Sequence, residues 1–386
     1  MASREKNFLK IAVFLVLLTG SLVAPNARAH DPSKSYLHLT LETNGFTGQW
    51  DVPIKDLQTV LPLDADHDGF VTWDELNARY TNVTSYVFTN LIISVDGRPV
   101  VCRVSNKEPT VEDFSDGTYV EIPFAIENTP SAKTIDLDYR LFFDVNSLHR
   151  GLMQLDYGGK TQTAIFSPDH STQSFVIGVT SPGRQFLVFL REGIFHIWTG
   201  YDHILFLVAL LLPAVLRQEA GKWRGVSALR PAFINVLKIV TAFTAAHSIT
   251  LSLAALQVVR LPSRLTESAI ALSVVLAAAN NLWPVVRERG WIVAFFFGLV
   301  HGFGFANALA DLGLVHGALA LTLVGFNLGV EVGQLAIVSV FLPVAFALRN
   351  TWFYQNPLLR FGSALIVVVA ATWLAERVFD FKILPF

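Results

Sequence analysis

Six ionisable residues stand out in the apolar second half of the chain, because such side chains are costly in a membrane and usually mark a site or a pathway. They are four histidines and two acids: His196, Asp202, His203, His247, His301 and Glu331. Neutral imidazoles together with carboxylates suit nickel, cobalt or zinc. The sequence therefore predicts that the six converge on one transition-metal site (Ni²⁺, Co²⁺ or Zn²⁺). For any single histidine, an interhelical hydrogen bond is an equal alternative.

The spacing of His196, Asp202 and His203 predicts that they lie on one face of a helix. His203 follows His196 by seven residues, close to two turns of an α-helix, so one unbroken helix would place both imidazoles on the same side. Asp202 then lies near enough to bind the metal or to orient a ligand. Small residues at four-residue intervals in later segments indicate close helix packing, and such packing is expected to bring Glu331 to His301.

A second set of metal ligands lies in the acidic first half, in the twelve-residue segment 64–75. The segment matches the EF-hand calcium loop at its diagnostic positions, with Gly69 at the sharp turn. Its expected ligands are the side chains of Asp64, Asp66, Asp68, Thr72 and Glu75 and the carbonyl of Phe70. We predict a bound Ca²⁺ that acts as a stabilising clip rather than as a sensor. The alternative is a solvated acidic turn.

The elements around this loop have a β-rich pattern from residue 30 to residue 181. Short segments such as 36–41 and 91–95 alternate apolar and polar residues, and turn signals such as Asp96-Gly97 separate them. This pattern predicts one β-sandwich-like domain.

The charge of this domain restricts its partners. Between His30 and Leu190 there are 21 acidic and 11 basic residues, a balance of about −10 that repels nucleic acid and attracts cations. Cys102 is the single cysteine of the sequence, so an intrachain disulfide is excluded. The domain must therefore be held together by its core or by bound ions.

From residue 182 to residue 386 the sequence changes to long apolar runs, each close to the ~20 residues that cross a bilayer. We expect about six transmembrane helices, at residues 193–216, 232–256, 267–286, 291–311, 317–347 and 358–378. The predicted fold class is an α+β two-part membrane protein, in which the β-rich domain precedes a polytopic helical bundle.

Targeting signals agree with this organisation. Residues 1–29 have the pattern of a signal peptide, with an apolar run at 11–18 and small residues at a cleavage site before His30. Eight basic residues fall in loops predicted to be cytoplasmic and four in outer loops and the tail, as the positive-inside rule expects. We predict a multi-pass protein of the bacterial inner membrane with domain 30–181 in the periplasm. Its expected partners are the lipid bilayer and divalent metal ions, and a periplasmic protein, unidentified from the sequence, is a further candidate.

With His196 followed after five residues by Asp202-His203, the membrane half resembles the HupE/UreJ family. The resemblance covers roughly residues 190–380, and the chain looks like the branch with an added periplasmic domain. That family is associated with hydrogenase and urease gene clusters and is regarded as a family of nickel permeases. The resemblance implies that His196, Asp202 and His203 form the metal-recognition motif.

The family's second motif, Phe-His-Gly-x-Ala-His-Gly-x-Glu, is partly present. His301-Gly302 keeps its first His-Gly pair, whereas Phe305 stands for the second histidine and Ala308 for the glutamate. Glu331, on another predicted helix, is the candidate replacement for the lost carboxylate.

These observations lead to one function and one main alternative. The first is a divalent metal permease, or metal-handling inner-membrane protein, of the nickel/cobalt type with a site that opens to the periplasm. The alternative is an intramembrane hydrolase in which histidines hold zinc and Asp202 or Glu331 activates a bound water. Whether the chain is an enzyme stays open, with the transporter favoured. A third reading is a periplasmic binding or assembly module with a membrane scaffold.

Overall fold

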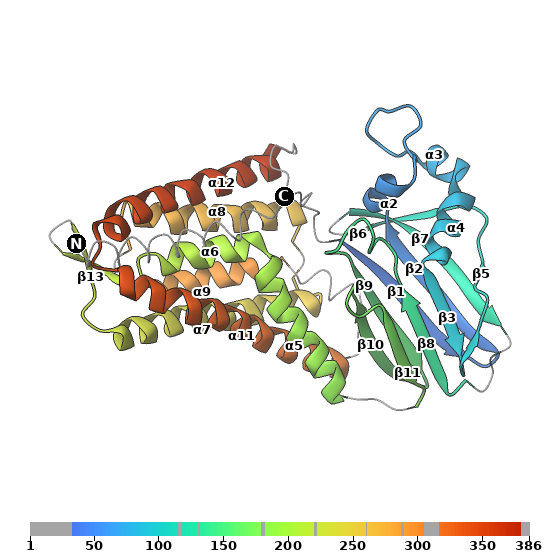
Figure 1. Cartoon of the computed structure of the whole chain (residues 1–386). Helices are drawn as coiled ribbons and strands as arrows, with labels where there is room; N and C mark the ends of the chain where they lie inside the picture. Colours follow the sequence, from blue (N-terminus) through green and yellow to red (C-terminus); the bar gives the residue numbers. More distant parts are fainter. Residues whose placement is uncertain are drawn as a thin grey trace, which may run out of the picture. The chain divides into compact units, whose positions relative to one another are not determined.

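The computed structural model of the chain describes residues 33–114, 117–127, 129, 132–178, 182–219, 222–259, 261–286, 289–304 and 316–379. It divides into a sheet-rich unit, assigned to His30–Val188 and Asn307–Thr322, and a helical unit that contains Phe189–Ala306 and Leu323–Phe386. The α+β organisation that the sequence predicted, with a sheet-rich region before apolar helices, is confirmed (Figure 1). The predicted signal peptide, residues 1–29, and His30 lie outside the described residues.

Two sheets build the sheet-rich unit. Their strands are β1 (Lys34–Glu42), β2 (Gly45–Pro53), β3 (Leu91–Val95), β4 (Arg98–Pro99), β5 (Arg103–Val104), β6 (Thr110–Phe114), β7 (Gly117–Glu127), β8 (Thr134–Tyr139), β9 (Arg150–Tyr157), β10 (Lys160–Phe166) and β11 (Thr172–Val176). The larger sheet has the order β10-β9-β1-β2-β7-β5, with β6 paired to β7, and the smaller has the order β11-β8-β3-β4. β1 and β9 pair in parallel; the other pairings within these two sheets are antiparallel.

Strand alternation places the core of this unit. In β7, alternate residues from Val120 to Ile126 are buried, as expected for a strand with one face on a core. Residues of both sheets belong to one hydrophobic cluster, which includes Trp50 and Leu137. Three helices also contribute to this cluster: α2 (Ile54–Val60), α3 (Trp73–Ala78) and α4 (Tyr80–Thr89).

A buried hydrogen-bond network crosses this core at His149, which is fully buried. Its Nδ1 lies 2.7 Å from Ser33 Oγ and 3.5 Å from Asp56 Oδ2. Its Nε2 lies 3.1 Å from Ser35 Oγ and 3.1 Å from Tyr139 Oη. Burial lowers the pKa of His149 below its usual value, against a smaller opposing effect of Asp56. The folded unit therefore favours the neutral imidazole.

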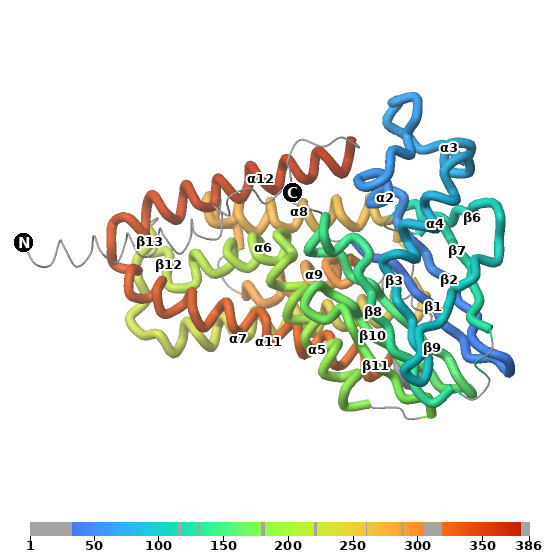
Figure 2. Tube along the Cα trace, turned by 45° about the vertical axis from the view of Figure 1, so that its right-hand side comes forward, coloured from blue at the N-terminus to red at the C-terminus, as the bar shows by residue number. Residues whose placement is uncertain are grey.

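The helical unit is a bundle of apolar helices with one short hairpin (Figure 2). Its elements are α5 (Pro182–Thr199), α6 (Tyr201–Leu211), β12 (Leu216–Glu219), β13 (Lys222–Gly225), α7 (Leu229–Ala255), α8 (Ser263–Leu282), α9 (Gly290–His301), α11 (His316–Leu348), the π-helical turn η1 (Tyr354–Leu358) and α12 (Leu359–Phe379). α12 packs extensively against α8, and α7 packs extensively against α9.

Four of the about six expected spans are found as single helices long and apolar enough to cross a membrane: Leu229–Ala255, Ser263–Leu282, Leu319–Leu348 and Tyr354–Phe379. The first expected span is instead the pair α5 and α6, bent by 70° and countable as a fifth. The fourth expected span, 291–311, is described only to residue 304 and contains the shorter apolar helix α9. The bundle is therefore a multi-pass membrane unit, and its described residues contain four such helices, or five with the bent pair.

Candidate metal centre

The break between α5 and α6 places His196 and His203 opposite each other. Gly200 separates the two helices, and glycine is a poor helix former. A Cβ atom at Gly200 would lie 2.9 Å from the His196 carbonyl oxygen and 2.9 Å from His203 Nδ1, so the close approach requires glycine. The prediction that one unbroken helix aligns the two histidines was wrong. The bend itself brings their ring centroids to 4.6 Å.

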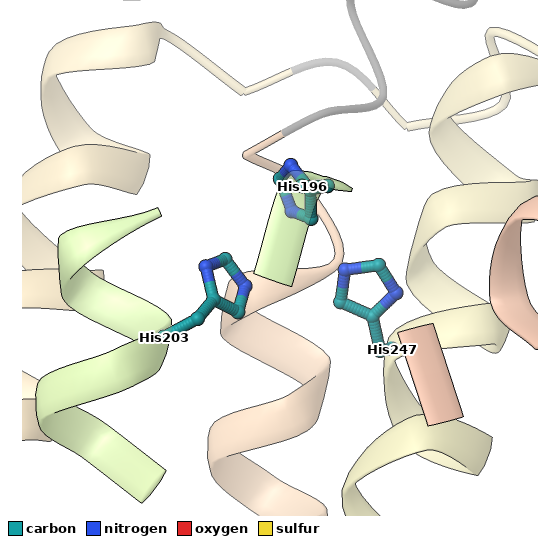
Figure 3. A group of neighbouring side chains, drawn as sticks. All are labelled: His196, His203 and His247. Atoms are coloured by element: carbon teal, nitrogen blue, oxygen red, sulfur yellow. The ribbon is translucent and has the colours of Figure 1, made fainter. Parts of the chain in front are cut away.

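Three imidazoles meet at this break, and Figure 3 shows their rings gathered around a common centre. The ring centroid of His247, on α7, lies 6.3 Å from that of His196 and 6.4 Å from that of His203. One ring nitrogen of each lies within 4.8 Å of the others. Because imidazole–metal bonds are about 2.0–2.1 Å long, small side-chain rotations would close the three around one ion.

Asp202 fixes the orientation of His203. Its Oδ1 accepts hydrogen bonds from the backbone N–H of His203 and from His203 Nδ1, both at 2.9 Å. Asp202 lies in the first turn of α6, where the helix dipole favours a carboxylate. With the proton on Nδ1, Nε2 keeps its lone pair, and this buried atom has no hydrogen-bond partner among the described residues. A carboxylate behind an imidazole is typical of metal ligands.

Asn327, on α11, fixes the orientation of the His247 ring. Its Oδ1 lies 3.2 Å from His247 Nδ1, and its Nδ2 donates to the Leu323 carbonyl oxygen at 2.8 Å, which fixes the amide orientation. His247 Nδ1 is therefore the donor. Nε2 of this fully buried ring keeps its lone pair and has no hydrogen-bond partner in the described part of the chain.

His301, the last residue of α9, is oriented by Ser273 of α8. The Ser273 hydroxyl donates to the Ile270 carbonyl oxygen at 2.6 Å, so it accepts from His301 Nε2 at 2.8 Å. His301 Nδ1 is thereby left with its lone pair, buried and without a hydrogen-bond partner within the described ranges. The rings of His301 and His203 are 5.0 Å apart, and both can share an ion with Asp202. His203 thus belongs to two overlapping ligand groups.

Close helix packing and aromatic rings enclose these groups. A Cβ atom at Gly302 would lie 2.4 Å from the His247 carbonyl oxygen, so the small-residue packing that the sequence predicted brings α9 against α7. Phe243 lies 5.2 Å from the His301 ring and Phe326 lies 5.3 Å from the His196 ring. In such a low-dielectric setting, charge–ligand interactions are stronger than in water.

Glu331 lies outside both ligand groups. Its helix packs elsewhere than expected, because a Cβ atom at Gly329 would meet the Leu190 carbonyl oxygen of α5 at 2.0 Å. The Glu331 carboxylate instead accepts a hydrogen bond from Thr241 Oγ1 of α7 at 2.9 Å. It lines a cavity of about 370 Å³ between α7 and α11. The structure therefore brings together five of the six predicted residues, and places Glu331 in a neighbouring cavity.

The acidic loop 64–75 of the sheet-rich unit is closed by its own side chains. Asp64 Oδ2 accepts from the Gly69 N–H at 3.0 Å, and Glu75 Oε1 accepts from the Ala65 N–H at 2.7 Å. Carboxylate oxygens of Asp64, Asp66 and Asp68 lie within 4.8 Å of one another. Asp64 Oδ1 is buried and has no hydrogen-bond partner among the described residues. These oxygens are of the kind that Ca²⁺ prefers.

The loop backbone also bends where an EF-hand-type loop would bend. Gly69 has φ 91° and His67 has φ 62°, both in the left-handed region. α3 follows at Trp73, and a capping box joins Thr72 to Glu75 at its start. Hydrogen bonds from Thr72 and Ala65 lower the pKa of Glu75 to about 2, so its carboxylate is ionised at neutral pH.

Two contributors to the histidine centre were not predicted. Ser273 has no neighbouring motif, and its only signal is a hydroxyl within an apolar run that continues to Val274. Gly200 was visible inside the first expected span, and glycine is a poor helix former. Both act by positioning histidines.

The apolar helices and the buried histidine centre together define a polytopic membrane protein with a candidate metal site. Residues 171–377 match the family described as HupE / UreJ protein. This match covers more than half of the chain, which therefore belongs to the HupE/UreJ family, a family of metal-handling membrane proteins linked to nickel and cobalt uptake. No curated protein matches the chain.

Proposed function

We propose that this protein is a permease for divalent transition metals of the nickel/cobalt type, with a histidine site that opens to the periplasm. One observation carries the proposal: Nε2 of His203, Nε2 of His247 and Nδ1 of His301 are buried lone-pair nitrogens without a hydrogen-bond partner among the described residues. In each ring the other nitrogen is held by a polar side chain. His196 adds a fourth imidazole.

This arrangement differs from interhelical hydrogen bonding. A histidine that only joins helices would be expected to use both ring nitrogens in hydrogen bonds, because a buried polar group without a partner costs about 1–3 kcal/mol. The three nitrogens here belong to two overlapping ligand groups that share His203. Borderline cations, for which imidazole is a good ligand, would satisfy them.

The overlap of the two ligand groups supports transport. An ion held by His196, His203 and His247 can pass to His203, His301 and Asp202 with His203 bound throughout. The two groups differ in charge, because only the second contains a carboxylate. We propose that this exchange is one step of metal movement through the bundle.

The alternative hydrolase would need an acid placed to activate a metal-bound water. Asp202 uses Oδ1 to orient His203, and Glu331 lies outside both ligand groups. Asp202 Oδ1 is thus engaged with His203 rather than free to activate a water, which supports the permease over the hydrolase.

Metal binding and uptake by the purified full chain test the proposal. We expect one Ni²⁺ or Co²⁺ to bind per chain by titration calorimetry, and reconstituted vesicles to take up the metal. His203→Ala and His247→Ala should abolish both, whereas His170→Ala, an exposed histidine of the sheet-rich unit, should leave both unchanged. Metal retained without uptake, together with hydrolysis of a lipid or peptide, would instead support the enzyme. Stoichiometric binding in all three variants would refute the site.

We also propose that the loop 64–75 binds Ca²⁺ as a structural clip. The support is the buried Asp64 Oδ1 and the three converging carboxylates. Ca²⁺ at a hundredfold excess over its Kd should stabilise the sheet-rich unit by about 2.7 kcal/mol. Glu75→Gln should remove most of this effect on the melting temperature, whereas Glu42→Gln, on β1, should not. Equal melting curves in Ca²⁺ and in chelator would exclude the clip.

A further inference from the structure

The cavity between α7 and α11 is lined by four apolar residues, Ala245, Leu323, Val324 and Leu328, and by a set of oxygen-bearing side chains. α7 contributes Thr241, Thr244, Ser248 and Ser252, and α11 contributes Asn327 and Glu331. Thr241 and Glu331 lie near the middle of their helices, whereas Ser252 lies close to the end of α7, so the cavity extends from the depth of the carboxylate toward that helix end. An ionisable group at that depth usually marks a pathway or site.

The hydroxyl groups of this cavity all donate their hydrogens to protein acceptors. Thr241 donates to Glu331 Oε1 at 2.9 Å and Thr244 donates to Gln334 Oε1 at 3.1 Å. Ser248 and Ser252 each donate at 2.7 Å to the carbonyl oxygen four residues earlier. The hydroxyl oxygens are therefore left with lone pairs only, and together with the Glu331 carboxylate they can serve as ligands for a cation.

The Glu331 carboxylate pairs with no cationic side chain of the described residues. In the part of the chain that the structure describes, no Lys, Arg or His forms an ion pair with its carboxylate. Its hydrogen-bond donor is the neutral hydroxyl of Thr241. Among the described residues the Glu331 carboxylate thus has no charged partner, which leaves a place for an external cation.

Asn327 connects the cavity to the histidine centre. Its side chain lines the cavity, and its Oδ1 accepts the hydrogen bond from His247 Nδ1. Ser248, another cavity residue, directly follows His247 in α7. A cation in the cavity is therefore separated from the first ligand group by one side-chain layer.

We propose that this cavity is a loading site, where Glu331 and the hydroxyl oxygens hold a hydrated divalent cation before it reaches His247. The proposal rests on the permease function proposed above. A carboxylate, hydroxyls and an amide are hard oxygen ligands that suit a cation still carrying water. The imidazoles of the histidine centre then replace the water molecules bound to the cation. A charged cavity of this kind raises association rates by about 10–10³, so its effect should be on the filling rate rather than on the final occupancy.

Stopped-flow mixing of the full chain with Co²⁺ tests this. The visible absorption of imidazole-bound Co²⁺ reports filling of the histidine site, and calorimetry reports its stoichiometry. Glu331→Gln keeps the acceptor for Thr241 but removes the charge, and Ser248→Leu blocks the cavity. Both should fill the histidine site at least about tenfold more slowly and still reach the wild-type stoichiometry.

Two control variants make the comparison specific. Glu267→Gln removes a carboxylate that pairs with Arg377 on another face of the bundle, and Ser339→Leu adds the same bulk at an exposed position of α11. Both should fill at the wild-type rate. Wild-type filling rates in Glu331→Gln and Ser248→Leu would overturn the loading site and leave the permease standing. Loss of stoichiometric binding in Glu331→Gln would instead show that Glu331 is a ligand of the histidine site. Absence of Co²⁺ binding in the unmodified protein would refute both proposals.

Discussion

Replacement of Asp202 by asparagine tests whether the histidines are oriented for metal binding. The Asp202 carboxylate accepts from both the backbone N–H and Nδ1 of His203, each at 2.9 Å. Asp202→Asn removes the charge and weakens the bond that holds the proton on Nδ1. Loss of such an orienting partner lowers metal affinity by about 10–100-fold, which corresponds to about 1.4–2.8 kcal/mol at 1.4 kcal/mol per tenfold.

The assay is calorimetric titration of the full chain in detergent with Ni²⁺. We expect Asp202→Asn to keep a stoichiometry of one with an affinity weaker by the factor above, and His203→Ala to lose binding altogether. Asp138→Asn is the matched control, because Asp138 pairs with Arg140 in the sheet-rich unit. Unchanged affinity in Asp202→Asn would show that the carboxylate does not orient His203. Binding lost as completely as in His203→Ala would make Asp202 an essential ligand.

Three further outcomes are expected. Burial lowers the folded-state pKa of His149, so unfolding takes up a proton as the pH falls below about 6.5. The melting temperature of the sheet-rich unit should therefore drop in that pH range. His149→Gln should reduce this drop, and an equal pH dependence of the melting temperature in both proteins would contradict the role of His149. Gly302→Val should destabilise the helical unit and abolish metal binding, because the valine Cβ would overlap the His247 carbonyl oxygen. A wild-type melting curve would show that α9 does not pack this closely against α7. Intact-mass measurement of protein from membranes should give His30 as the first residue, and a mass that starts at Met1 would exclude cleavage.

Much of the fold was predictable because alternation and apolar length are local signals. The segment 91–95 is strand β3, and the expected span 232–256 lies almost wholly within α7. The parallel pairing of β1 with β9 was not predictable from pattern, since strand partners more than one hundred residues apart leave no local signal.

The candidate site was predictable in its residues but not in its geometry. Histidines in an apolar run are conspicuous because membrane burial is costly for them, so His247 and His301 were found directly. The bend at Gly200 was missed, because one continuous helix was assumed from His196 to His203, whereas α5 ends just before Gly200. Glu331 was assigned to the wrong neighbour, because the partner of a small-residue face cannot be read from one helix alone.

X-ray absorption spectroscopy of the full chain loaded with one equivalent of Ni²⁺ tests the central claim most directly. We predict a first shell dominated by imidazole nitrogens, with the outer-shell scattering of at least three rings, and a loss of that scattering in His203→Ala and His247→Ala. A first shell of oxygen atoms alone, or an imidazole count unchanged in both variants, would contradict the assignment of the histidine centre as the metal site.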